Sequence, residues 1–206
     1  MKLFKNNQTG RSMVEMLGVL AIIGVLSVGG IAGYSKAMLK HKISQMLDMV
    51  SSYIARWIEV DSANNSTIVD AYGQMAQKFG FDCDYDKERD ICKHPFGHFG
   101  MSFNNKGGVF MVQFDGDTAQ TACVELLSSE YYKNIPDDWW YPKGHIYVYN
   151  GTDYEYFYGK SEYALGLGAK PNVTAEDISR ACYTCRDIND GYEPSCRVML
   201  YTKNEI

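Results

Sequence analysis

Two hydrophobic patterns follow one another in the first part of the chain. Residues 16–35 carry no side chain that is charged at neutral pH, and a helix of that length spans about 30 Å, the thickness of a bilayer core. From residue 34 to residue 59, apolar side chains recur at three- and four-residue steps, which is typical of an amphipathic helix. No proline interrupts either pattern. We therefore predict one long helix over residues 11–60, with a transmembrane segment at 16–35 and an amphipathic second half.

Beyond residue 60 the chain alternates short apolar runs with turn residues, which predicts several short elements. In chain order we expect a helix at 68–79, a hairpin at 101–104 and 109–114, a helix at 119–129, a hairpin at 146–149 and 154–158, a helix at 174–183 and a strand at 197–202. This order predicts an α+β fold in which an antiparallel sheet packs against the amphipathic half of the long helix. Residues 61–206 are expected to form one globular head with its own core.

The charge balance of the chain is acidic. Of 206 residues, 20 are lysine or arginine and 25 are aspartate or glutamate, for a formal net charge of −5. That balance argues against nonspecific binding to nucleic acid. A local basic cluster directly after the apolar run fits a band at a membrane surface and contains Lys36, Lys40, His41 and Lys42.

A short motif precedes the apolar run. Gly10 is followed five residues later by Glu15, and a short polar, basic leader comes before the glycine. A carboxylate at the edge of an apolar span is costly unless a group of opposite charge pairs with it. Cleavage after Gly10 leaves the apolar helix in the mature chain, with Glu15 close to a new amino terminus at Arg11. Without cleavage the same pattern is a signal anchor whose Glu15 lies among the lipid headgroups.

Residues 10–56 resemble the N-terminal region of type IV pilins and type II secretion pseudopilins. The matching features are the basic leader, Gly10, Glu15 and an apolar helix that continues into an amphipathic one. The resemblance implies that a prepilin peptidase cuts between Gly10 and Arg11 and methylates the new N-terminus. It also implies that Glu15 sets the register of subunits in a filament. Arg11 departs from the family, whose first mature residue is usually apolar.

The resemblance implies a pilin-like fold and a structural role in place of an enzymatic one. We expect a leader at 1–10, the long helix at 11–60 and a head at 61–206, forming a subunit of a type IV pilus or related filament. Its expected partners are other pilin subunits, a prepilin peptidase and an assembly platform in the inner membrane. The chain is expected in that membrane before assembly and in an extracellular or periplasmic filament afterwards. The alternatives are a minor pseudopilin of a type II secretion system and an anchored, exported binding protein that never polymerises.

Six cysteines lie beyond the apolar run, and an even count in an exported domain predicts disulfides. They are Cys83, Cys92, Cys123, Cys182, Cys185 and Cys196. The first two close a short acidic loop and are the expected local pair. Cys123, within a predicted helix, is expected to bond to one of the three C-terminal cysteines, and which one stays open. This resembles the disulfide that ties the C-terminal segment of type IV pilins to the head.

Cys182 and Cys185 also have the spacing of a redox motif, which gives a third class, an anchored thiol oxidoreductase. Thiolate chemistry of that kind needs the start of a helix, whereas this pair falls at a helix end. We therefore expect structural disulfides.

A second set of residues could be interpreted as zinc ligands, but this interpretation is weaker. Cys83, Cys92, His94 and His98 are ligand types for zinc, but their spacing matches no common zinc module and the exported side is oxidising. His94 stands beside Pro95 and is expected in a surface turn.

The acidic loop begins like a calcium site. Asp82, Asp84 and Asp86 alternate, but Lys87 and Lys93 stand where an EF-hand needs glycine and glutamate, which excludes that module. Because some pseudopilins hold calcium in a loop of the head, a looser calcium site stays an alternative here or around a second acidic group. That second group is Asp187, Asn189, Asp190 and Glu193. We expect a solvated acidic loop and no cofactor.

Aromatic residues are the most unusual part of the composition. Besides Trp139, Trp140 and Tyr141, five tyrosines alternate along the predicted second hairpin, at 147, 149, 154, 156 and 158. Alternating residues of a strand share one face of a sheet. They predict either an aromatic patch for contact with a ligand, a surface or a subunit, or a sheet core with cross-strand pairs. No nucleophile, base and acid combine into a catalytic arrangement by spacing.

Overall fold

The structure is a computed structural model that describes residues 13–64, 79–86, 89–104, 107–140, 143–149, 153–183, 185 and 195–202. The chain divides into two compact units, Met1–His41 and Lys42–Ile206. Most of the predicted helix at 68–79 lies outside the described residues, as do Tyr141 and the second acidic group at 187–193.

The first element is a single long helix, α1 (Met13–Asn64), which covers most of the predicted helix at 11–60. Because it contains no proline, its hydrogen-bond ladder runs without interruption over 52 residues. Among the described residues, no helix has both the length and the apolar character needed to cross a membrane. The predicted transmembrane segment at 16–35 is therefore not found in the part of the chain that the structure describes.

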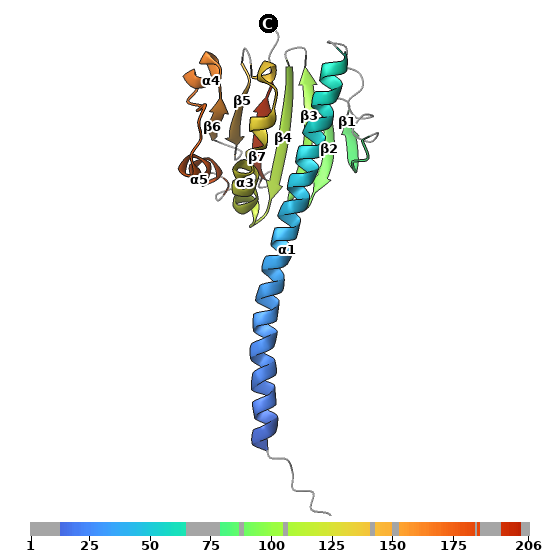
Figure 1. The fold of residues 1–206 in the computed structure, drawn as a ribbon, viewed down its shortest axis with the longest axis vertical. Coiled ribbons are helices and arrows are strands. Elements are labelled where there is room, and N and C mark those ends of the chain that lie inside the picture. The colour runs from blue at the N-terminus through green and yellow to red at the C-terminus, as the bar shows by residue number, and fades with distance from the viewer. Residues whose placement is uncertain are drawn as a thin grey trace, which may run out of the picture. The chain divides into compact units, whose positions relative to one another are not determined.

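The second unit contains an antiparallel sheet, as predicted. Its seven strands lie in the order β1-β2-β3-β4-β7-β5-β6 (Figure 1). The strands are β1 (Cys83–Asp86), β2 (Arg89–His94), β3 (Gly97–Asn104), β4 (Gly107–Asp115), β5 (His145–Tyr149), β6 (Tyr154–Gly159) and β7 (Ser195–Tyr201). The C-terminal strand β7 is inserted between β4 and β5. Both predicted hairpins and the predicted last strand are confirmed.

The acidic loop predicted between Cys83 and Cys92 is wrong, because this segment is a pair of strands, β1 and β2. The aspartates at 82, 84 and 86 alternate with Phe81, Cys83 and Tyr85. An alternation of polar and apolar residues is the pattern of a strand. The spacing that suggested a calcium loop is therefore the spacing of β1.

Short helices complete the second unit. They are α3 (Ala119–Ser128), η2 (Tyr131–Asn134), η3 (Asp137–Trp139), α4 (Glu162–Gly166) and α5 (Ala175–Tyr183). The predicted helices at 119–129 and 174–183 are confirmed as α3 and α5. The prediction missed α4, which is only one turn long and begins where the Ser161 hydroxyl accepts a hydrogen bond from the Ala164 amide.

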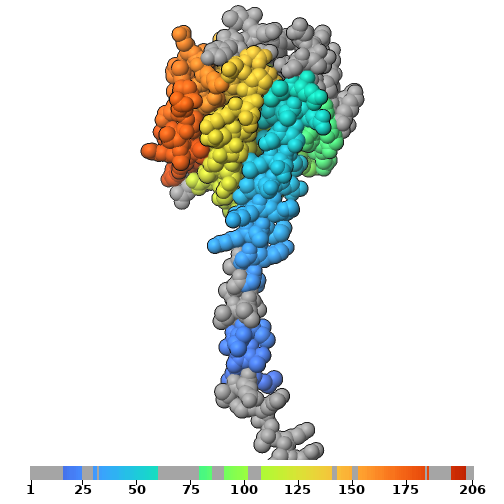
Figure 2. All heavy atoms as spheres, in the orientation of Figure 1, coloured from blue at the N-terminus to red at the C-terminus, as the bar shows by residue number. Residues whose placement is uncertain are grey.

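Residues of α1 beyond Lys42 cover one face of the sheet together with α3 (Figure 1). Met46, Val50 and Trp57 are buried on this side of the helix. Tyr53, also buried, has its ring centroid 5.1 Å from that of Phe99 on β3. Figure 2 shows the helical layer from outside, with the segment that contains α3 and η2 directly beside α1. The prediction that the amphipathic half of the helix packs on the sheet is confirmed.

Along each strand, successive side chains alternate between this covered face and the opposite one. On β4, Phe110, Val112 and Phe114 are buried, whereas Met111 and Gln113, between them, are only partly buried. Successive side chains of a strand point to opposite faces. The sheet therefore presents its second face away from α1 and α3.

Gly97 offers a test of the turn between β2 and β3. Its φ is +150°, and an added Cβ would lie 2.3 Å from the Gln113 carbonyl oxygen on β4. We expect Gly97→Ala to lower the free energy of unfolding by about 2–4 kcal/mol, because strain and overlap with backbone add together. Gly166→Ala in α4 is the matched control, since an added Cβ there meets nothing within 4 Å. Urea unfolding of both variants measures the difference, and equal stabilities would contradict this account of the turn.

Candidate functional site

An exposed apolar surface lies on the first turns of α1. Every residue from 16 to 24 is apolar or glycine, and every one is exposed. The large side chains among them have exposed fractions from 52% to 71%; they are Met16, Leu17, Val19, Leu20, Ile22 and Ile23. At 3.6 residues per turn these nine positions surround the helix instead of forming a stripe. A helix that is apolar all round is one that other molecules or other helices bury.

The cleavage motif that precedes this surface falls largely outside the described residues. Gly10 and Arg11 lie before the first described residue, and of Glu15 the structure describes only the helical backbone. The predicted cleavage, methylation and registration roles therefore stay predictions. Small residues continue along the helix at Gly18 and Gly24, where an added Cβ would meet nothing within 4 Å. Packing within this chain does not require glycine at either position.

All six cysteines are described, and all form disulfides. Cys83 and Cys92 are opposite each other in the β1–β2 register, so the predicted local pair is confirmed. Cys123 on α3 bonds to Cys182 on α5, which confirms that it reaches the C-terminal cysteines and identifies the partner.

The last disulfide joins Cys185 to Cys196 on β7. Cys182 and Cys185 are therefore bonded to different partners. The redox interpretation needs these two cysteines to bond to each other, and they do not.

The four residues considered as zinc ligands do not form a site in this form of the chain. The thiols of Cys83 and Cys92 are consumed by their disulfide. His94 is buried, which contradicts its predicted place in a surface turn. Its Nε2 lies 2.9 Å from the Gln113 carbonyl oxygen, and its Nδ1 accepts a hydrogen bond from the Phe96 amide. Both ring nitrogens are thus used by backbone groups, one on β4 and one in the β2–β3 turn.

Of the three aspartates that begin the acidic segment, the structure describes the side chains of Asp82 and Asp84. Asp84 is exposed on β1 and lies 3.8 Å from the Lys93 ammonium group. Among the described residues, no three carboxylates lie close enough together to hold a cation. Asp187, Asn189, Asp190 and Glu193 lie outside the described residues, so the second calcium alternative stays a prediction.

The buried imidazole of His94 gives a pH dependence with a definite sign. Burial lowers the pKa of His94 from 6.5 to about 4. The folded state holds the ring neutral. Its contribution to the free energy of unfolding is therefore complete above pH 6.5 and is lost as the pH falls towards 4. We expect a loss of about 3 kcal/mol in the free energy of unfolding over that interval from this group. Unfolding measured at intervals between pH 7 and pH 4 tests this.

The control is His94→Gln, whose amide can replace the hydrogen bonds but cannot titrate. Burial also lowers the pKa of His145, and that group remains in both chains. The stability of the variant should therefore fall less steeply with acid than that of the parent. Parallel curves for the two chains would show that His94 is not the titrating group.

The second face of the sheet carries a cluster of aromatic rings, here called the aromatic face. Its members are His145, Tyr147, Tyr149, Tyr154, Tyr156, Tyr163 and Tyr201. The rings of His145 and Tyr201 are parallel with centroids 5.2 Å apart, and those of Tyr149 and Tyr154 are stacked at 4.6 Å. Ile146 and Val148 alternate with these residues on β5 and are buried on the covered face.

Tyr158 does not belong to the aromatic face, which corrects the prediction that five alternating tyrosines share one side. The register shifts between Ile146 and Tyr147, so that Tyr158 pairs with Ile146 while Tyr156 pairs with Tyr147. The extra residue, Phe157, changes the side to which the next side chain points. Tyr158 therefore lies on the covered face, with its ring centroid 4.8 Å from that of Trp140.

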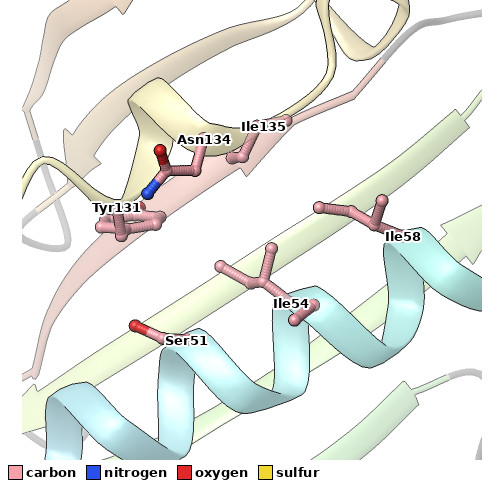
Figure 3. Close-up of a pocket in the computed structure, with 7 residues that line it drawn as sticks. Ser51, Ile54, Ile58, Tyr131, Asn134 and Ile135 are labelled. Carbon is pink, nitrogen blue, oxygen red and sulfur yellow. The ribbon is translucent and has the colours of Figure 1, made fainter.

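A groove of about 260 Å³ lies between α1 and the segment after α3 (Figure 3). It is lined by Ser51, Ile54, Ala55, Ile58, Tyr131, Asn134 and Ile135. In Figure 3 the side chains of Ile54 and Ile58 on α1 face Tyr131 and Ile135 across the groove. Tyr131 is the one titratable residue in the lining, and burial raises its pKa. The groove is suited to apolar contact and offers no general acid or base at neutral pH.

Compared with models of protein families, with curated proteins and with solved structures, the chain matches none. Its function is therefore argued from the residues and their arrangement.

Proposed function

We propose that the chain is a structural subunit of a type IV pilus or a related filament, a pilin or pilin-like protein. The observation that carries this proposal is the apolar surface that surrounds α1 from residue 16 to residue 24. The Gly10 and Glu15 motif immediately before it supports the same function.

Burial of this surface holds the assembled filament together outside the membrane. There, each large apolar side chain that neighbouring subunits keep out of water stabilises the filament by about 1.5–3 kcal/mol. One neighbour covers only one side of a helix, whereas these residues surround it. Several copies of the same helix, packed around one another, cover all sides at once. Gly18 and Gly24 allow such helices to approach closely.

Cleavage after Gly10 prepares this contact in the proposed mechanism. It removes the basic leader and creates an α-amino group at Arg11, four residues before Glu15. In the filament the Glu15 carboxylate of one subunit pairs with the α-amino group of its neighbour. Because an unpaired charge among apolar helices is costly, this pairing selects one axial register.

The same proposal includes partners and a location. A prepilin peptidase processes the chain, and an assembly platform in the inner membrane adds it to the filament. Before assembly the precursor resides at that membrane. This part of the proposal rests on the apolar run at 16–35 alone. The head carries the disulfides that an oxidising exterior favours.

The filament fraction of a producing cell tests the proposal. Mechanical shearing releases filaments and leaves envelope proteins behind, so the chain is expected in the sheared fraction when the assembly ATPase is active. In a strain without that ATPase the chain should remain with the envelope. Recovery in the envelope alone in both strains would overturn the proposal.

An anchored binding protein is the second candidate, and the aromatic face is the observation that favours it. Tyr154 and Tyr163 have 55% and 47% of their surface exposed, at the edge of this stacked cluster. Aromatic rings with hydroxyl groups give large contact areas at low entropic cost.

A pair of variants tests the aromatic face as a binding surface. Tyr154→Ala with Tyr163→Ala should weaken retention on a neutral polysaccharide column by about tenfold or more, since each anchoring aromatic contributes about 1–2 kcal/mol. Tyr183→Ala on α5 is the control, because Tyr183 is 56% exposed but lies off this face. Equal retention of all the chains would remove this candidate.

A further inference from the structure

Four cysteines from three separate parts of the second unit meet in one buried cluster. Cys123 lies on α3, Cys182 on α5, Cys185 just after α5 and Cys196 on β7. All four are buried. The Sγ atoms of Cys123, Cys185 and Cys196 lie within 4.8 Å of one another, and Cys182 is bonded to the first of them. This group is called the cysteine cluster below.

We propose that the cysteine cluster, in its reduced form, is a binding site for one zinc ion. The proposal is independent of filament assembly and concerns the chain before its disulfides form. Zinc in structural sites takes four ligands in a tetrahedron, and four cysteine thiolates are one of the common sets. Two of the four, Cys182 and Cys185, have the two-residue spacing at which zinc modules commonly supply a ligand pair.

The backbone already holds three of the four sulfurs near one another, and the fourth belongs to a residue bonded to one of them. A zinc–sulfur distance of about 2.3 Å places the sulfurs of a tetrahedron about 3.8 Å apart. The Cα atoms of Cys123 and Cys182 are 5.7 Å apart, and those of Cys185 and Cys196 are 5.0 Å apart. The sulfurs of Cys123, Cys185 and Cys196 are already close together, and in the reduced chain the Cys182 sulfur would have to turn towards them to complete the tetrahedron.

Binding is an exchange of protons for metal and needs no electron transfer. Four thiols lose four protons, and their sulfurs bind Zn²⁺ as thiolates. Zinc and the two disulfides exclude each other, because each bridged sulfur has given up its thiolate. A newly made chain carries thiols and needs no reductant. In the oxidised chain each disulfide must first take up two electrons and two protons from a reductant such as a phosphine.

The zinc form would join the same elements as the disulfides do. Either closure ties α3, the end of α5 and β7 together. In the reduced chain, zinc binding then contributes directly to the stability of the fold, as it does in small zinc domains.

The thiols themselves report on this site. The full-length chain in detergent is reduced with a phosphine, freed of reductant without oxygen, and mixed with Zn²⁺. We expect about one tightly held zinc per chain by elemental analysis. Alkylation followed by peptide mass spectrometry, with and without Zn²⁺, should find that zinc slows the modification of Cys123, Cys182, Cys185 and Cys196 but not that of Cys83 and Cys92. This map uses the unaltered sequence, so it does not depend on whether a variant folds.

Two variants sharpen the test. Cys83→Ala with Cys92→Ala should keep the zinc, because this pair is bonded on β1 and β2, away from the cluster. Cys182→Ala with Cys185→Ala should lose it. No retained zinc on the reduced parent chain, or protection spread evenly over all six cysteines, would overturn the inference.

Discussion

Glu15→Ala is expected to enter filaments at least about tenfold less often than the parent chain while still being cut after Gly10. In the proposed filament the carboxylate pairs with the α-amino group of a neighbouring subunit, in apolar surroundings. Removing one member of a buried pair leaves the other charge without compensation, at a cost of about 3–5 kcal/mol. Partial exposure near the end of the helix reduces this cost. A loss of about 1.4 kcal/mol is nevertheless enough to lower the equilibrium constant for incorporation tenfold. The ratio of the chain in sheared filaments to that in the envelope measures the effect.

Two further substitutions separate charge from shape at this position. Glu15→Asp keeps the charge on a shorter side chain and should restore part of the assembly. Glu15→Gln keeps the shape without the charge and should behave like alanine. Normal incorporation of the glutamine variant would show that registration does not depend on the charge of Glu15.

Removing the disulfide between Cys123 and Cys182 should have the largest effect on the stability of the second unit. It closes a loop of 59 residues, for which the chain-entropy model gives about 4 kcal/mol at 25 °C. The free energy of unfolding of a typical domain is only about 5–15 kcal/mol. We therefore expect the chain with Cys123→Ala and Cys182→Ala to unfold at much lower urea concentrations than the parent.

The disulfide between Cys83 and Cys92 is the matched control for this prediction. It spans only 9 residues, which corresponds to about 2.5 kcal/mol in the same model. Urea unfolding of the two double-alanine variants under identical conditions should rank them in the order of loop length. The reverse order would show that packing around the sulfurs outweighs loop entropy in this protein.

The sequence predicted the elements in which apolar residues recur at a regular spacing. The steps between Met46, Val50 and Trp57 identified the helix face that packs on the sheet, and turn residues located both predicted hairpins. Pattern failed at β1, where the alternation of aspartates with Phe81 and Cys83 predicted an acidic loop, although the same alternation is the period of a strand. Because an acidic residue can be a ligand or simply exposed, the residue type alone does not decide between the two.

Features that depend on long-range pairing could not be predicted from the chain. The bulge opposite Ile146 moves Tyr158 to the covered face, and a single inserted residue leaves no clear signature in composition. Cys123 had three possible C-terminal partners, and only the packing of α3 on α5 identifies Cys182. The buried position of His94 follows from the carbonyl groups that surround it, of which one belongs to Gln113 on β4.

The candidate site at the N-terminus was predicted by a local motif, which the fold of the second unit does not test. Gly10 and Arg11 are outside the described residues, whereas the exposed apolar surface from residue 16 onward is an independent observation. Both features support the proposed assembly through α1, which requires removal of the basic leader.

The intact mass of the chain, purified from cells that contain a prepilin peptidase, tests this account most directly. We predict a mature chain that begins at Arg11, lighter than the precursor by residues 1–10 and heavier by one methyl group if the new N-terminus is modified. A chain that keeps Met1, or one cut beyond the apolar run so that residues 16–24 are lost, would contradict assembly through α1.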